Sequence, residues 1–354
     1  MNPVAPLVLP PLSALYGVIT RTRLSMYRRG TFRTTRLTQP VISVGNITTG
    51  GTGKTPLVEW LARMLANNGR RVAVLTRGYG RERAHERVLV SDGQAVFSTP
   101  EQAGDEAFLE ATNLKGLAAV ISDANRIAAA EDAVKHLHTN CFVLDDGFQH
   151  LRLARDLDIV TIDATNPWGG GRLLPEGRLR EPLTGLRRAD CIVLTRVDQV
   201  DDIRSIEQQL RPLISCPVFT SRMKTRRVTP SNEPSAKVAN PVGAFCGIGN
   251  PDSFFTHLQR EGYDPVFKKA LRDHQPYSQQ LIDSIINEAE QSGARTLLTT
   301  AKDAVKLRSL NLRLPIFSVD VEIAIDDEPA FTELVLNAAT MSSPQIHADK
   351  HKSD

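Results

Sequence analysis

One stretch decides the fold: Val41-Ile-Ser-Val-Gly45-Asn-Ile-Thr-Thr-Gly50-Gly-Thr-Gly-Lys54-Thr55. Apolar residues 41–44 are typical of a buried strand, and a glycine-rich turn follows them. Residues 57–65, after the turn, have the spacing of an amphipathic helix. Glycines let backbone N–H groups converge on phosphate oxygens, and the start of a helix adds partial positive charge. The sequence therefore predicts a phosphate-binding loop between a strand and a helix.

The residues of this loop have separate predicted roles. We expect Lys54 to reach the β- and γ-phosphates of a nucleotide and the Thr55 hydroxyl to hold Mg²⁺. The common loop has glycine at position 48 and the variant with two adjacent glycines usually has lysine at position 49, whereas this chain has threonine at both. The residues predicted to bind the nucleotide are Thr48, Thr49, Gly50, Gly51, Thr52, Gly53, Lys54 and Thr55.

Apolar runs of strand length recur along the chain, with helical patterns between several of them. The predicted strands are residues 41–44, 72–75, 118–121, 141–144, 159–162 and 191–194. The predicted helices are residues 57–65, 102–112 and 124–138. Continuous apolar strands that alternate with helices predict an α/β fold, with a P-loop NTPase-like parallel sheet and helices on both faces.

The pattern changes after this first unit. Residues 221–241 are polar and contain three prolines, so we expect a linker there. Beyond it we expect a second, smaller α/β domain with strands at 242–246 and 296–298 and helices at 253–261 and 278–291. The predicted organisation is an N-terminal segment 1–36, a nucleotide-binding domain 37–220, a linker 221–241, a smaller domain 242–340 and a loose tail 341–354.

The positive charge of the chain is concentrated at its N-terminus. The formal net charge is +3, and the first 40 residues hold six arginines and no acid. A local basic patch argues against a general nucleic-acid surface. Apolar residues 4–19 are too short to span a bilayer, and their arginines follow the apolar run, which is not the order of a secretory signal. A helix from about Leu12 remains, either lying amphipathically in an anionic membrane interface or packed on its own domain.

Acids follow or precede several predicted elements. The strand at 141–144 ends in Asp145-Asp146, as in a Walker B element that orders Mg²⁺. Asp105 and Glu106 begin a helical stretch, where an acid either favours the helix N-terminus or, for Asp105, accepts the proton of an incoming hydroxyl. His274 lies beside an aspartate in a loop and is either a surface residue or the partner of such a base.

Two further segments carry weaker signals. Residues 169–182 form a long connection rich in glycine and arginine, typical of a binding loop or a lid. The run Thr195-Arg196-Val197-Asp198 is similar to the base-reading element of GTPases, which normally has lysine at its second position.

Together these pieces resemble the tetraacyldisaccharide 4′-kinase family of lipid A biosynthesis. The matching pieces occur in the family's order between about residues 12 and 310: 43–56, Arg77-Gly-Tyr-Gly80, Gly104-Asp-Glu106, Leu144-Asp-Asp-Gly-Phe-Gln-His150, Leu174-Pro-Glu-Gly-Arg-Leu-Arg-Glu-Pro182, Asp273-His274 and Lys302-Asp303.

The resemblance implies ATP and Mg²⁺ as cofactors and two α/β domains with the active site between them. It implies transfer of the γ-phosphate to the 4′-hydroxyl of a tetraacylated glucosamine disaccharide 1-phosphate, at the cytoplasmic face of the bacterial inner membrane. The expected contacts are this lipid and an anionic membrane, with no nucleic acid and no obligate protein partner.

Carried over by position, Asp105 is the expected base, with His274 tuning it, and Lys54 completes the catalytic set. The expected metal shell is Thr55, Asp145, Asp146, Gln149 and Glu181. The other expected phosphate or substrate contacts are Tyr79, Glu106, His150 and Arg180. Ala301 stands where the family pattern has an acid, so the role of Lys302-Asp303 stays open.

Two other classes of protein compete with this interpretation. A regulatory GTPase or metallochaperone would need the lysine of the base-reading element and a cluster of cysteine and histidine, and the chain has neither. A non-catalytic adaptor at a membrane surface would not need Lys54, Thr55 or the paired acids.

Overall fold

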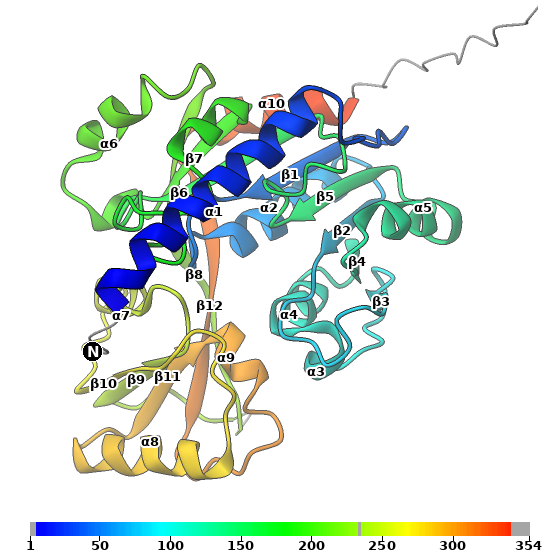
Figure 1. Cartoon of the computed structure of the whole chain (residues 1–354). Coiled ribbons are helices and arrows are strands. Elements are labelled where there is room, and N and C mark those ends of the chain that lie inside the picture. The colour runs from blue at the N-terminus through cyan, green and yellow to red at the C-terminus, as the bar shows by residue number, and fades with distance from the viewer. Residues whose placement is uncertain (1–4, 233–234, 341–354) are drawn as a thin grey trace, which may run out of the picture.

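The computed structural model describes residues 5–232 and 235–340, and the predicted tail 341–354 lies outside the described residues. Within them, twelve strands form one sheet that runs through two halves of the molecule (Figure 1). The strand order is β10-β9-β11-β12-β8-β7-β6-β1-β5-β2-β4-β3. The α/β class predicted from the sequence is confirmed.

The larger half holds strands β1 to β7, and its α-helices are α1 to α6. Its strands are β1 (Val41–Gly45), β2 (Val72–Thr76), β3 (Val88–Ser91), β4 (Ala118–Ser122), β5 (Cys141–Asp145), β6 (Leu157–Asp163) and β7 (Cys191–Thr195). Its helices are α1 (Ala5–Arg28), α2 (Lys54–Asn67), α3 (Pro100–Ala103), α4 (Asp105–Asn113), α5 (Arg126–Leu137) and α6 (Ile203–Leu210), with 3₁₀ turns at Leu183–Arg188 and Val197–Gln199.

The smaller half holds the remaining strands and most of the remaining helices. Its strands are β8 (Val218–Pro230), β9 (Val242–Cys246), β10 (Phe267–Ala270), β11 (Thr296–Thr300) and β12 (Ile316–Ile325). Its helices are α7 (Pro251–Arg260), α8 (Gln279–Gln291) and α9 (Ala301–Val305), and the chain ends its described part with α10 (Glu328–Thr340).

Parallel pairing explains why the predicted strands are continuously apolar. Strands β7, β6, β1, β5, β2 and β4 are parallel neighbours, and every residue of these six strands is buried. One face carries α2, α4 and α10, and the other carries α5 and α6. Because helices cover both faces, the strands need no polar alternation. The carboxyl ends of β1 and β5 therefore lie side by side, where the phosphate loop and Asp145 begin.

The predicted linker differs from the structure. Residues 221–230 continue strand β8, which pairs antiparallel with β12 and joins the two halves as a two-stranded ribbon. The prolines misled the prediction, although Pro230 lies at the end of the strand, where a missing N–H is tolerated. The predicted domain at 242–340 also differs, because Phe331 and Val335 of α10 lie in the core of the larger half beside α2.

Helix α1 begins earlier than predicted and includes Pro10 and Pro11. One side of α1 contacts the loop of residues 173–180. There the Tyr16 hydroxyl donates to the Arg180 carbonyl at 2.8 Å. A Cβ on Gly17 would lie 2.8 Å from the Leu173 side chain, which would have to shift to accommodate it. No helix among the residues 5–232 and 235–340 is long and apolar enough to cross a membrane.

Candidate active site

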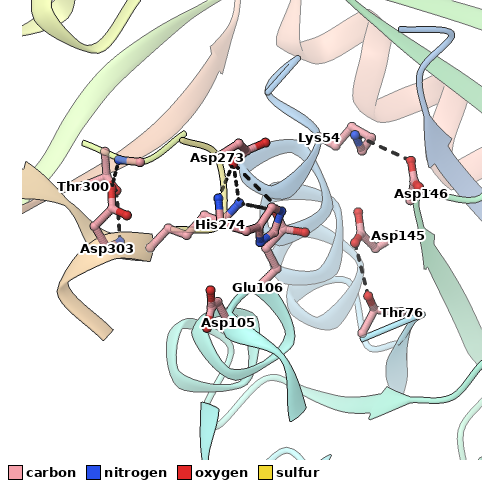
Figure 2. Close-up of polar contacts among 12 residues, drawn as sticks. Lys54, Thr76, Asp105, Glu106, Asp145, Asp146, Asp273, His274, Thr300 and Asp303 are labelled. Carbon is pink, nitrogen blue, oxygen red and sulfur yellow. Dashed lines mark hydrogen bonds and ion pairs between the residues drawn. The ribbon is translucent and has the colours of Figure 1, made fainter. Parts of the chain in front are cut away.

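A cavity of about 540 Å³ lies between the two halves. The larger half lines it with the loop 49–56, the acids after β5 and part of α4, and the smaller half with the loops after β9 and β10 and the start of α9. Figure 2 shows Lys54, Asp145 and Asp146 on one side of this space and Asp273 and His274 facing them from the other half. The placement between two α/β halves agrees with the expectation from the resemblance.

The phosphate loop passes directly into α2. Gly53 precedes the helix with φ 80°, a left-handed conformation that favours glycine, and Lys54 is the first helical residue. The N–H groups at this end of α2 have no partners within the helix, so they are free to bind an anion. The Lys54 ammonium lies 3.6 Å from Asp146, and both residues line the cavity.

The beginning of the loop differs from the prediction. The Thr49 N–H donates to the Arg178 carbonyl at 2.7 Å, and the Arg178 guanidinium donates back to the Thr49 carbonyl at 3.1 Å. Thr48 pairs with Leu179 in an isolated bridge and is buried. These two residues were predicted to cradle phosphate, but their backbone is paired with the loop 178–180. The open part of the cradle therefore begins at Gly50.

Thr52 anchors the loop to the sheet instead of facing the cavity with its hydroxyl. That hydroxyl contacts the Thr161 hydroxyl at 2.8 Å and accepts from Asn46 at 3.0 Å, and the Thr52 side chain is buried. Its carbonyl accepts a hydrogen bond from the Thr195 hydroxyl at 3.0 Å. The loop is thus held in place by strands β6 and β7, which leaves little freedom to reorganise around a phosphate.

Arg196 holds the same loop from another direction. Its guanidinium donates to the Gly51 carbonyl at 2.8 Å and to Asp163 at 2.6 Å. Asn250 of the smaller half donates to the same Asp163 carboxylate at 2.8 Å. The sequence placed Arg196 in a motif but not in this contact, because Asp163 and Asn250 are distant in the chain.

Asp146 is fixed by two cations. Arg180 donates to both of its carboxylate oxygens at 2.7 Å. The sequence predicted Arg180 as a phosphate or substrate contact, whereas in the structure its guanidinium contacts this acid. Burial alone would raise the pKa of Asp146, but the charges of Lys54 and Arg180 outweigh it and lower that pKa to about 2. Asp146 is therefore an anion at neutral pH.

Asp145 is the buried member of the pair. It accepts a hydrogen bond from the Thr76 hydroxyl at 3.3 Å, and its other oxygen, Oδ1, has no hydrogen-bond partner. Burial, together with the nearby carboxylates of Glu106 and Asp146, raises the pKa of Asp145 to about 7. A buried carboxylate oxygen without a partner, at the edge of this cavity, is suited to bind a divalent cation.

The structure does not bring the whole predicted metal shell together. Glu181 is buried and pairs with Arg188 at 2.8 Å, and Gln149 donates to Glu181 at 2.9 Å. Neither lines the larger cavity, and no group of three His, Cys, Asp or Glu residues in the described chain forms a metal cluster. Both residues were expected to contact metal, whereas in the structure they form a hydrogen-bonded network with Arg188 outside the cavity lining.

His150 also lies outside the cavity. Its Nε2 atom is buried and has no partner, and burial together with the charge of Arg126 lowers its pKa to about 4. The expected role of His150 as a phosphate or substrate contact therefore stays a prediction.

The predicted base and its histidine are separated in this structure. Asp105 is the first residue of α4 and pairs with Lys306 at 3.4 Å, whereas its neighbour Glu106 lines the cavity. Among the described residues, no hydrogen bond or ion pair joins Asp105 to His274. His274 instead contacts Lys302 and the ring of Tyr79, and both of these residues line the cavity.

The geometry also tests the GTPase interpretation. Asp198, which would read a guanine in that class, pairs with Arg260 of α7 at 3.0 Å. Arg196 of the same element binds the Gly51 carbonyl of the phosphate loop. Neither residue is therefore free to contact a guanine base. The GTPase alternative therefore loses its structural basis.

Comparison with known proteins agrees with the site. The family model described as Tetraacyldisaccharide-1-P 4'-kinase matches residues 5–340. Among curated relatives, Tetraacyldisaccharide 4'-kinase from Desulfotalea psychrophila is 40% identical over 92% of this chain and 94% of its own length. The protein of the same name from Geobacter metallireducens is 40% identical over 90% of this chain and 94% of its own length.

A solved structure resembles the whole chain. The crystal structure of LpxK from Aquifex aeolicus in complex with ATP has a TM-score of 0.72 and 31% sequence identity. The match covers 93% of this chain and 97% of the other. With the phosphate loop, the paired acids and the cleft described above, these similarities show that the chain belongs to the tetraacyldisaccharide-1-phosphate 4′-kinase family, and that it is a kinase.

Proposed function

We propose that the protein transfers the γ-phosphate of ATP to the 4′-hydroxyl of a tetraacyldisaccharide 1-phosphate, which yields the 1,4′-bisphosphate of lipid A biosynthesis. One observation carries the proposal. A single cavity joins the phosphate loop, its acids and Glu106 on the larger half to Asp273 and His274 on the smaller half. This arrangement has room for a nucleotide and a sugar hydroxyl at the same time.

The residues of the larger half bind and orient the nucleotide. Lys54 and the N–H groups from Gly50 onward neutralise phosphate charge, and the loop is held by Thr161, Thr195 and Arg196. Phosphoryl transfer depends mainly on positioning and electrostatic stabilisation, so a rigid cradle is the main requirement. Because the site lies in a cleft between two halves, closure of the smaller half over it would exclude water from the reacting groups.

Mg²⁺ fits the residues at the end of β5. Asp145 has an oxygen without a partner, Asp146 is anionic, and Thr55 lines the same cavity. Mg²⁺ is commonly held by one or two carboxylates together with substrate phosphates, so these three residues would hold it. When bound, the ion neutralises charge that develops on the β- and γ-phosphate oxygens. Gln149, Glu181 and Arg188 would support the Asp146–Arg180 side from behind.

For proton removal we propose Asp105, with Glu106 beside it on the cavity wall. Asp105 begins a helix, a position at which the helix dipole favours an acidic residue. His274 and Tyr79 lie next to Glu106 on the acceptor side of the cavity and would position the sugar. Since Asp105 lies just outside the cavity lining, a small rotation of its side chain is part of the proposal.

The same proposal includes peripheral contact with an anionic membrane at the cytoplasmic face. Helix α1 exposes four large apolar residues, Leu12, Leu15, Val18 and Ile19, at 44–56% exposure. Tyr16 of the same helix points inward, where its hydroxyl donates to the Arg180 carbonyl. Exposed arginines continue from this face toward residue 33, as expected for a helix at an anionic interface.

A direct assay tests the proposed reaction. The full chain is incubated with Mg²⁺, ATP labelled at the γ-phosphate and a tetraacyldisaccharide 1-phosphate in detergent micelles. We expect label at the 4′ position of the lipid, and none with Lys54→Ala. Release of inorganic phosphate without any labelled lipid would contradict the proposal and favour a hydrolysing NTPase.

A further inference from the structure

Lys302 lies in the cleft and touches both halves. It is the second residue of α9 in the smaller half, and its ammonium lies 2.9 Å from Glu106 of the larger half. Within its own half it lies 3.4 Å from Asp273 and 3.2 Å from Nε2 of His274. Its side chain is only 15% exposed, and all four residues line the cavity. Figure 2 shows Glu106, Asp273 and His274 gathered at one point.

Nε2 of His274 lies 3.2 Å from the Lys302 ammonium, whereas the carboxylate oxygen of Asp273 lies farther from Nε2, at 3.9 Å. An ammonium group has three donors and no acceptor, so Nε2 of His274 must accept the hydrogen bond with its lone pair. A neutral imidazole with an unprotonated Nε2 carries its proton on Nδ1. A second proton on Nε2 would remove the acceptor and place a cation 3.2 Å from another cation. Lys302 therefore selects the neutral tautomer with Nδ1–H.

The rest of the surroundings holds His274 rigidly. Its backbone has φ 57°, a left-handed conformation that non-glycine residues adopt rarely. Its N–H donates to the Asp273 carboxylate at 3.1 Å, and the Tyr79 ring lies 4.9 Å from the imidazole between centroids. Strained backbone persists where surrounding contacts determine it, often at functional sites.

Charge on both partners supports the hydrogen-bond assignment. Burial would lower the pKa of Lys302, but the carboxylates of Glu106 and Asp273 outweigh it and raise that pKa. Burial would raise the pKa of Glu106, but Lys302 outweighs it and lowers that pKa. Lys302 is thus a cation at neutral pH and Glu106 an anion, and the pair spans the cleft.

We propose that Lys302 is a positioning residue of the phosphotransfer site, which fixes His274 as the neutral Nδ1–H tautomer and ties it across the cleft to Glu106. The proposal rests on the proposed function for its meaning in catalysis. It implies that His274 offers an N–H to the reacting groups and does not accept the sugar proton at Nε2. It also answers the open question about the Lys302-Asp303 motif, because the lysine acts without the acid that is missing at Ala301.

The first test reads the tautomer directly and needs no catalysis. In ¹⁵N-histidine-labelled full chain at neutral pH, the signals of His274 are identified by their loss in His274→Gln. We expect an unprotonated Nε2 and a protonated Nδ1 in the unmodified chain and in Lys302→Arg, whose guanidinium also only donates. In Lys302→Met we expect the proton to move toward Nε2. A protonated Nε2 in the unmodified chain, or no change in Lys302→Met, overturns the proposal.

A matched control guards against a loss of structure. Lys269→Met removes another lysine of the smaller half, which pairs with Glu288 away from the cavity, and should leave the His274 signals unchanged. Thermal unfolding of each variant establishes that it is folded. If Lys302→Met does not fold, Lys302→Gln replaces it, because a neutral amide can donate or accept and no longer forces one tautomer.

The second test links the tautomer to turnover. We expect Lys302→Met to lower kcat about 10–100-fold, the cost of misplacing a positioned group, with the KM for ATP changed less than about twofold. Lys302→Arg should recover part of the loss. In a His274→Gln background Lys302→Met should cost less than about threefold, because the two residues act as a unit. Full multiplication of the two losses overturns the proposal. An unmodified chain that labels no lipid would instead refute the proposed function, and the tautomer test would still stand.

Discussion

The ammonium of Lys54 lies 3.6 Å from a carboxylate oxygen of Asp146, so the first residue of α2 faces the residue that follows β5. Substituting Lys54→Ala removes the cation nearest to the phosphate cradle. We expect kcat/KM to fall by at least about 10²–10³-fold, the usual cost of one electrostatic contact in the transition state. The Lys54 side chain lines the cavity and is not part of the apolar core, so far-UV circular dichroism should be unchanged. A folded variant with near-normal turnover would sink the phosphate-loop assignment.

ATP should be strongly preferred over GTP. The element that reads guanine in GTPases is occupied here, since Asp198 pairs with Arg260 and Arg196 holds the loop. The measurement is kcat/KM for each nucleotide with the same lipid acceptor. Equal values, or a preference for GTP, would restore the regulatory GTPase interpretation.

Asp105→Asn should lower kcat about 10²–10⁴-fold, the range of general-base assistance, with little effect on the KM for ATP. Glu106→Gln is the matched variant one residue along α4, on the cavity wall. We expect it to cost less, because its proposed role is in positioning with Lys302. The opposite ranking would transfer the role of base to Glu106.

Exposed apolar residues on α1 should govern membrane association. Leu15→Ser combined with Ile19→Ser removes two side chains that are each 56% exposed. Since full burial of such a side chain contributes about 1.5–3 kcal/mol, binding to anionic vesicles should fall about tenfold or more in a flotation assay. The melting temperature should not change, because neither side chain is in the core. Tyr16→Phe, on the inner face, should leave vesicle binding intact. Unchanged flotation of the double variant would assign α1 to packing alone.

Stability should fall as the pH rises through the titration of Glu59. Burial outweighs its contacts with Asn113 and Arg63 and raises its pKa from 4.5 to about 7. An acid with a raised pKa in the folded state binds more protons there than in the unfolded chain, so its contribution is present below pH 4.5 and lost toward pH 7.

The unfolding free energy should therefore drop by about 3–4 kcal/mol as the pH rises from below 4.5 to above 7, since the two pKa values differ by about 2.5 at about 1.4 kcal/mol per unit. Glu59→Gln should lack this part of the slope in urea titrations at pH 5 and pH 8. The matched control is Glu131→Gln, an exposed acid on α5, which should keep the slope. An identical slope in Glu59→Gln would show that the carboxyl titrates normally.

Local signals predicted most of the fold, and distant pairings account for what was missed. The strand, glycine turn and helix around Lys54 lie within one short stretch, and β9 begins and ends at the predicted residues. Strand β8 was taken as a linker because only one of its faces is buried, and the alternating residues of β12 were overlooked for the same reason. A strand with one buried face is apolar at every second position, so it lacks the continuous run that identified the others.

The candidate site shows the same division. The sequence identified Lys54, Asp145, Asp146 and Glu106, since each stands at the end or start of a regular element. It could not show that Glu181 is neutralised by Arg188, or that the Thr49 N–H is already paired. Those contacts depend on how a long loop folds back, and a pattern of residue types does not fix that path.

The ribbon of β8 and β12 also determines how the halves can move. Between residues 221–227 and 320–325, each of these strands pairs only with the other, and the register shifts at Asp320. Two-stranded ribbons carry a larger twist between their strands than wide sheets do. We therefore expect a relative rotation of the two halves to be distributed over several residues of both strands, with the paired backbone favouring one orientation. The two halves would then return to the same relative orientation after each turnover, because the backbone geometry of the ribbon sets that orientation.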